Sequence, residues 1–184
     1  MTNINPVSFV GSTKGAWKVT RIDTIAGTPL APIPYIDAYP THTPSMPTDW
    51  ILRGTNNHTR YSKREEVEVM KARQEGLGRS HATHAALIPI RKNAAWWDMA
   101  QDERRRIFEE ESQHISLSLD YLPAIARRLY HSRDLGEPFD FLTWFEFAPE
   151  HEGAFDALVA KLRASREWQF VDREVDIRLV KATT

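Results

Sequence analysis

The chain has 184 residues, 41% of them hydrophobic, and a formal net charge of −1. This length fits one domain or a closely packed pair of half-domains, and the hydrophobic share suffices for a core, which excludes a long disordered protein. Lys and Arg are spread along the sequence, so nothing supplies the basic face that binding to nucleic-acid phosphates needs. The absence of cysteine excludes disulfides, thiolate metal sites, iron–sulfur clusters and cysteine nucleophiles.

The N-terminal residues MTNINPVSFVGS contain neither a positively charged region nor an apolar run of the kind found in secretory signals. No stretch approaches the ~20 apolar residues of a membrane span. We therefore expect a cytoplasmic protein with no membrane contact.

The N-terminal quarter of the chain combines one strand pattern with a proline-rich segment. Residues 17–25 alternate well enough for a strand. Residues 26–48 hold six of the eleven prolines, a density that interrupts helices and central strands, so we expect an ordered surface crossover there: Pro29, Pro32, Pro34, Pro40, Pro44 and Pro47. We expect residues 1–48 to pack on a main domain formed by residues 49–184.

Regular patterns follow in the main domain. Strands are expected at 49–54, 85–92, 139–147 and 171–180. Helices are expected at 62–75, with Ser62 as N-cap and Glu65 completing a capping box, at 102–122, at 124–131 after an interruption near Pro123, and at 150–168.

This order is β-α-β, a long helical insertion, and a second β-α-β. Two such units predict an α+β fold with a ferredoxin-like antiparallel sheet and helices on one face. Structure added to a minimal fold is a sensible place to look for function, so we expect the site in the insertion.

The insertion carries one metal-ligand pattern, Glu111-x-x-His114, which places a carboxylate and an imidazole on one helical face. Di-iron carboxylate bundles use this spacing but need two copies and two further Glu residues. The chain has one copy, which argues against a di-iron site. On its own, His114 is either a ligand or an ordinary surface or core histidine.

Aromatic residues are abundant for a domain of this size. They form either an ordinary core between sheet and helices or an apolar slot for a flat macrocycle, and composition does not choose between these. They are Trp96, Trp97, Phe139, Phe141, Trp144, Phe145 and Phe147.

Several segments, taken in order, carry a family resemblance. They are LIPIRKNAAWW (87–97), His114, the run RRLYH (127–131) and FDFLTWFEF (139–147), with support from residues 50–70 and 166–179. In this combination the chain resembles the chlorite dismutase family over about residues 49–181. It is most similar to the short form, which lacks the fuller N-terminal half-domain and is typically dimeric.

The resemblance implies one haem b per subunit in a homodimer, with His114 as the proximal ligand of the iron. It implies that Glu167 accepts a hydrogen bond from the other ring nitrogen, which fixes the tautomer. From the residue alone, Glu167 could equally be a solvated group at a helix end. Arg127 matches the distal arginine, and the thirteen-residue spacing from His114 requires the break at Pro123 to fold the segment around a pocket.

Further positions are implied as parts of the haem site. The distal cavity lining matches Leu129, Thr143, Phe145 and Leu158, with Ile88 and Trp97 as additional contacts. Positions near the propionates and the proximal face match Tyr61, Lys92 and Trp96. Lys92 could also be an ordinary exposed lysine at a strand end.

The implied reaction converts chlorite to chloride and dioxygen. Arg127 suits it because a guanidinium is permanently cationic and can hold an oxyanion near the iron without supplying or removing a proton.

Three alternatives stay open. The first is coproheme decarboxylase of the same superfamily, whose best-known form has a tyrosine where this chain has Ile88 and lacks a distal arginine such as Arg127. The second is a ferredoxin-like dimeric binding module without a cofactor. The third is a non-specific haem peroxidase, which should be slow without a distal acid or base.

Overall fold

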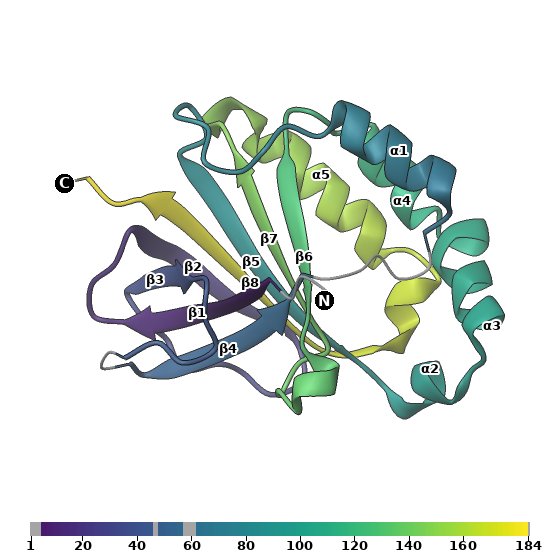
Figure 1. Cartoon of the computed structure of the whole chain (residues 1–184), viewed down its shortest axis with the longest axis horizontal. Coiled ribbons are helices and arrows are strands. Elements are labelled where there is room, and N and C mark those ends of the chain that lie inside the picture. Colours follow the sequence, from purple (N-terminus) through teal and green to yellow (C-terminus); the bar gives the residue numbers. More distant parts are fainter. Residues whose placement is uncertain (1–4, 46–47, 57–61, 184) are drawn as a thin grey trace.

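The computed structural model describes residues 5–45, 48–56 and 62–183. Within these residues, eight antiparallel strands close into a barrel in the order β1-β3-β2-β8-β5-β7-β6-β4 (Figure 1). The expected antiparallel α+β architecture is therefore confirmed. The strands are β1 Pro6–Ser12, β2 Trp17–Ala26, β3 Tyr35–Tyr39, β4 Trp50–Thr55, β5 His84–Lys92, β6 Ala126–His131, β7 Phe141–Phe147 and β8 Val171–Lys181.

The helices gather on one side of the barrel, outside the strands that belong to the C-terminal part of the chain (Figure 1). They are α1 Arg64–Arg73, α2 Ala94–Asp98, α3 Gln101–Arg105, a π-helical segment Arg106–Glu111, α4 His114–Leu119 and α5 Glu152–Arg163. Short 3-10 turns cover Arg133–Leu135, Pro149–His151 and Glu167–Phe170. In the part of the chain that the structure describes, none of these helices has the length and apolar character that crossing a membrane requires.

The strands β8-β5-β7-β6 form the ferredoxin-like half of the barrel. One crossover, from β5 to β6, contains α2, α3, the π-helical segment and α4, and the other, from β7 to β8, contains α5. The helices that we expected to form the site thus lie inside one β-α-β unit.

The predicted helix at 124–131 is wrong, because these residues form β6. Backbone pairing with β7, from Ala126↔Glu146 to His131↔Phe141, outweighs the helical preference of the Ala and Arg residues in this run. The change matters for function, because alternate residues of a strand point to opposite faces.

The N-terminal part has more strands than the sequence predicted. β3 was expected to be crossover, yet it occupies the proline-free stretch between Pro34 and Pro40 and pairs with β1 and β2. β1 was not predicted, because nearly all of its residues are buried and it lacks the alternation of a half-exposed strand.

The expected long helix at 102–122 is broken into three segments. After the π-helical turns, Gln113 adopts a left-handed conformation with φ of 51°, and α4 begins at the next residue, His114. The capping of α1 is also shifted by one residue, since the Glu66 carboxylate, rather than that of Glu65, accepts the backbone N–H of Lys63 at 2.7 Å.

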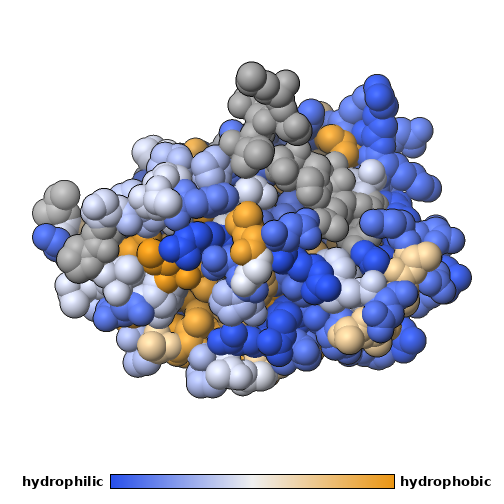
Figure 2. Space-filling view, turned by 60° about the horizontal axis from the view of Figure 1, so that its bottom comes forward, coloured by the Kyte–Doolittle hydropathy of each residue, from blue (hydrophilic) through white to orange (hydrophobic). Residues whose placement is uncertain are grey.

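β7 is covered on both of its faces, which explains why most of its residues are apolar and why all except Thr143 are buried. Leu142 and Trp144 point into the barrel, where the indole stacks on Phe9 at 5.4 Å. Phe145 points to the other face and packs against Phe155 of α5. Figure 2 shows the molecule with the lower side of Figure 1 turned forward. The surface is mainly hydrophilic over the helical half, and apolar side chains are exposed nearer the barrel.

Candidate active site

A cavity of about 560 Å³ lies where the sheet face carrying β5, β6 and β7 meets the helical crossover. Its size falls within the ~300–1,000 Å³ of typical small-molecule and cofactor sites. Of the residues singled out from the sequence, these line it: Ile88, Lys92, His114, Arg127, Leu129, Thr143, Phe145, Leu158 and Glu167.

A buried carboxylate organises one side of the cavity. Glu167 accepts a hydrogen bond from His114 Nδ1 at 2.7 Å through Oε2 and an ion pair from Lys92 Nζ at 2.5 Å through Oε1. Both Glu167 and Lys92 are buried, at 2% and 4% exposed. Glu167 is therefore not the solvated residue that the sequence alone also allowed, and Lys92, although it ends β5, is not exposed.

Burial and the neighbouring charges have opposite effects on the pKa of Glu167. Burial alone would raise the pKa of this carboxyl, but the Lys92 ammonium and the His114 imidazole outweigh it and lower the pKa to about 2. Burial lowers the pKa of Lys92, and the Glu167 carboxylate opposes that shift. The carboxylate is therefore ionised and accepts hydrogen bonds on both oxygens.

Two aromatic rings lie nearly parallel to the His114 imidazole. Phe108 has its centroid 4.5 Å away at an interplanar angle of 23°, and Trp168 lies at 6.3 Å and 23°. Within the described residues, Nε2 of His114 has no hydrogen-bond partner, although the residue lines the cavity. With Nδ1 engaged by a carboxylate, Nε2 is the nitrogen available to a ligand.

The backbone before His114 explains how a short segment carries this imidazole to the cavity. The left-handed Gln113 turns the chain, and Glu109 from the π-helical segment accepts the N–H groups of Ile115 at 2.7 Å and Ser116 at 3.2 Å. These bonds satisfy donors at the start of α4 that have no partner within the helix. π-helical turns are often found at functional sites.

Arg127 reaches the cavity from β6, a different element from His114. Its guanidinium donates to Ser118 Oγ at 3.2 Å and lies 3.4 Å from Met70 Sδ. Among the described residues it has no carboxylate partner, and burial lowers its pKa. Gln74 Nε2 donates to the backbone carbonyl of the same residue. Arg127 is thus a half-buried cation at the cavity, without a carboxylate partner among the described residues.

Arg128 is also among the cavity-lining residues but is exposed. The strand conformation of β6 gives the two arginines different directions, and Arg127 is the less exposed of the two.

The remaining walls are mainly apolar. Ile88, Phe145 and Leu158 belong to one buried cluster or border it, while Leu129 is 40% exposed towards the opening. Ile88, Leu129, Phe145 and Leu158 were expected from the sequence to line the cavity and are all apolar. Thr143, the fifth expected lining residue, adds a hydroxyl.

Two of the predicted residues do not line the cavity. Trp96 is buried beneath it, with Lys92 Nζ 3.4 Å from the ring centroid, and Trp97 donates from Nε1 to Asp140 at 3.0 Å. Tyr61 lies outside the described residues. The sequence reasoning missed Phe108, Ser118 and Trp168 as site residues, although Trp168 directly follows Glu167 and could have been found as its neighbour.

The fold and the site define an antiparallel α+β barrel protein with a largely apolar cavity, in which a buried Glu–Lys pair holds a histidine and an arginine has no carboxylate partner among the described residues. The family model for chlorite dismutase matches residues 43–182. The chain therefore belongs to the chlorite dismutase family.

Solved structures agree with this assignment. A dimeric chlorite dismutase from Nitrobacter winogradskyi is 55% identical, with a TM-score of 0.90 over 96% of this chain and 99% of that chain. A chlorite dismutase from Candidatus Nitrospira defluvii is 25% identical, with a TM-score of 0.61 over 74% of this chain and 56% of that chain. A chlorite dismutase from Ideonella dechloratans is 36% identical over 92 residues, which are 46% of this chain and 30% of that protein. The match thus spans less than a third of this relative.

Proposed function

We propose that this protein is a haem b enzyme that converts chlorite to chloride and dioxygen, in which His114 would hold the iron and Arg127 would hold the oxyanion. The observation that carries the proposal is the Glu167 carboxylate, which joins His114 and Lys92 beside a cavity that is also lined by Arg127, a cation without a carboxylate partner in the described part of the chain.

The residues present fit a haem. A porphyrin supplies four nitrogen ligands itself, so the protein needs to provide one donor and an apolar space. His114 offers Nε2, because its Nδ1 donates to Glu167, and the cavity walls include Ile88 and Phe145. Bound haem would supply an iron atom that can bind and activate an oxyanion.

The chain's own residues would hold the proton of the imidazole in place. Lys92 keeps Glu167 ionised, so the carboxylate accepts a hydrogen bond from Nδ1–H and leaves the Nε2 lone pair free. A charged acceptor strengthens this bond and increases the basicity of the ligand nitrogen.

Arg127 would act on the substrate. A guanidinium has donors but no acceptor and does not deprotonate in proteins, so it can bind chlorite without exchanging a proton. The apolar walls exclude water and make the attraction between this cation and the anion stronger than in solution. The products, chloride and dioxygen, together contain all the atoms of chlorite, so no proton has to enter or leave.

The proposal is tested by titrating the purified protein with haem and then measuring oxygen evolution with a Clark electrode after chlorite is added. We expect a Soret band and oxygen release. A protein that takes up no haem would instead favour the cofactor-free binding module. The decarboxylase is tested by incubating the protein with coproheme and peroxide and analysing the product by mass spectrometry. Haem uptake without oxygen release, together with the loss of two carboxyl groups from coproheme, would favour the decarboxylase.

Two variants separate the proposed roles. His114→Ala should weaken haem retention. Arg127→Ala should keep haem but lower the rate of oxygen release by roughly 10²-fold, the scale for removing one preorganised charge-stabilising donor. Arg64→Ala, on the exposed surface of α1, is the matched control and should resemble the parent.

We also propose that the protein is a homodimer, because the similar chlorite dismutase from Nitrobacter winogradskyi is dimeric. Sedimentation velocity at several concentrations tests this, and a monomer across the range would contradict it.

A further inference from the structure

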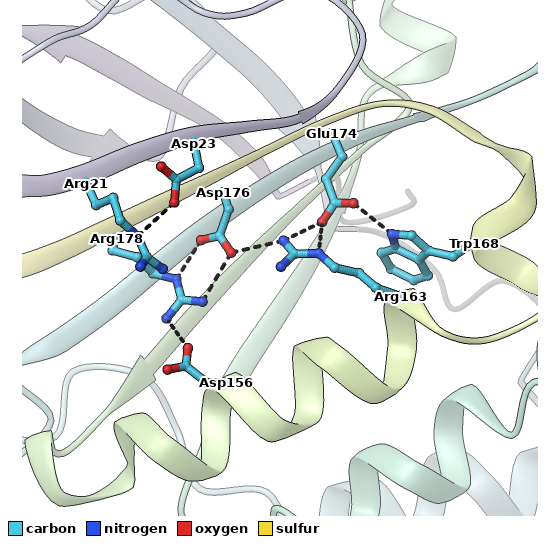
Figure 3. A network of polar contacts seen from close by, with 8 residues as sticks. All are labelled: Arg21, Asp23, Asp156, Arg163, Trp168, Glu174, Asp176 and Arg178. Atoms are coloured by element: carbon cyan, nitrogen blue, oxygen red, sulfur yellow. Dashed lines mark hydrogen bonds and ion pairs between the residues drawn. The ribbon is translucent and has the colours of Figure 1, made fainter.

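A cluster of buried charges lies between α5 and β8, next to the cavity (Figure 3). Arg163 donates to Glu174 at 2.8 Å and to Asp176 at 2.9 Å. Arg178 continues the cluster with two bonds to Asp176, at 2.5 and 3.1 Å. The carboxylates of Glu174 and Asp176 are each 1% exposed.

Burying so many charges calls for a physical explanation. Removing ion pairs from water is costly, and well-packed apolar groups of the same volume often give equal or greater stability. Elsewhere on α5 the helix packs against the sheet through apolar side chains, namely Phe155, Leu158, Val159 and Leu162. What charged groups provide in exchange is a single defined geometry, because each partner must keep its hydrogen bonds.

That geometry extends to one cavity residue. Glu174 uses Oε1 for Arg163 and Oε2 for Trp168, whose Nε1–H donates to it at 2.8 Å. The indole of Trp168 therefore cannot swing away without leaving a buried carboxylate oxygen unpaired. Figure 3 shows the indole at the end of this series of contacts.

Trp168 in turn lies almost parallel to His114, at 6.3 Å and 23°. The hydrogen bond from His114 Nδ1 to Glu167 fixes the position of one ring atom, but it leaves the ring free to tilt about that bond. An aromatic ring that lies parallel to the imidazole limits this tilt. Phe108 provides one, and Trp168 provides a second that is anchored by a hydrogen bond.

We propose that Trp168, anchored by Glu174 and Arg163, is a positioning residue that fixes the plane of the His114 imidazole. Its effect on an iron atom rests on the proposed function, whereas its effect on the imidazole does not. The plane of an imidazole bound to iron would affect how its π orbitals overlap with those of the metal, so a fixed plane would narrow the range of electronic environments at the iron.

The first experiment uses the full-length protein without haem, so it does not depend on the proposed function. The ¹³C relaxation of labelled histidine reports the order parameter of the His114 ring, assigned from the signal missing in His114→Gln. Rigid groups have values of about 0.85 and flexible ones below about 0.6. We expect a rigid ring in the parent and a flexible one in Trp168→Leu, with Trp168→Phe and Glu174→Gln between them.

The matched control is Trp50→Phe. Trp50 is also a half-buried tryptophan with a bonded N–H, to the Ala31 carbonyl at 3.1 Å, but it lies on β4 away from the cavity. It should leave the His114 order parameter unchanged. Because Trp168→Phe keeps an aromatic ring in place, it remains informative if Trp168→Leu does not fold.

The second experiment adds haem and records the ferric electron paramagnetic resonance spectrum. We expect one rhombic signal in the parent and a broadened or mixed signal in Trp168→Phe. If no variant binds haem but the order parameters fall as expected, the proposed function fails and this inference stands. If haem binds, and Trp168→Phe and Glu174→Gln match the parent in both relaxation and spectrum, the inference is overturned and the proposed function is unaffected.

Discussion

Replacing Lys92 with Met tests its buried ion pair with Glu167, the carboxylate that accepts a hydrogen bond from His114. Met has a similar length and no charge, so the variant leaves the Glu167 carboxylate in place without its ammonium. We expect a large loss of folding free energy at neutral pH, because an uncompensated charge is then buried.

The magnitude follows from the carboxyl group. Its pKa falls from 4.5 to about 2 in the folded protein. At about 1.4 kcal/mol per pH unit, this corresponds to about 3 kcal/mol of stability. Because the folded pKa is the lower one, this contribution is fully present above pH 4.5 and is lost as the pH falls towards 2. Lys92 and His114 lower this pKa together, against burial, so the net shift sets the scale of the effect and not the share of Lys92. Lys92→Met should therefore cost on the order of 3 kcal/mol at pH 7, as for breaking a buried ion pair, and progressively less below pH 4.5, because Glu167 is then protonated in the unfolded chain.

The assay is urea denaturation at pH 7 and at pH 3, followed by far-ultraviolet circular dichroism. Lys18→Met, at an exposed position of β2, is the control and should change the free energy of unfolding by less than about 0.5 kcal/mol. The double variant Lys92→Met/Glu167→Gln removes both charges and should recover most of the loss. Equal effects of the two lysine variants, or a double variant weaker than Lys92→Met, would refute the reasoning.

Three further predictions concern the scaffold. Gln113→Gly should be neutral or stabilising and Gln113→Val should cost about 1–2 kcal/mol in urea denaturation, because the backbone there has φ of 51°; equal stabilities would contradict this. Arg105→Gln should speed amide hydrogen exchange in α1. This helix buries none of its residues, so the hydrogen bonds from Arg105 to Glu66, at 2.5 and 2.7 Å, are expected to hold it on the protein; unchanged exchange would contradict this role. Phe155→Ala should cost about 3–5 kcal/mol, because its ring is fully buried against Phe147; a loss below 1 kcal/mol would show that the helix does not depend on this contact.

Much of the sheet could be predicted from local pattern. Residues 17–25, 49–54, 85–92, 139–147 and 171–180 were expected to be strands, and each corresponds to a strand of the barrel, β2, β4, β5, β7 and β8. β-branched and aromatic residues are concentrated in them, so intrinsic preference and tertiary pairing agree.

The errors arose where tertiary contacts override local preference. The run AIARRLYH favours a helix in isolation, but β7 offers it a complete set of backbone partners. The interruption near Pro123 could be seen in the sequence, whereas the left-handed turn at Gln113 could not, because glutamine has no marked preference for that conformation.

The candidate site shows the same division. The sequence by itself determined which chemical groups are available, namely one imidazole in the crossover, a guanidinium thirteen residues later and an absence of thiols. The family resemblance implied the hydrogen bond between His114 and Glu167, but only the tertiary structure decided that Lys92, 75 residues before Glu167, contacts the other carboxylate oxygen. The physical reason is that local preferences act over a few neighbouring residues, whereas closure of the barrel brings β5, α4 and the turn before β8 around one cavity.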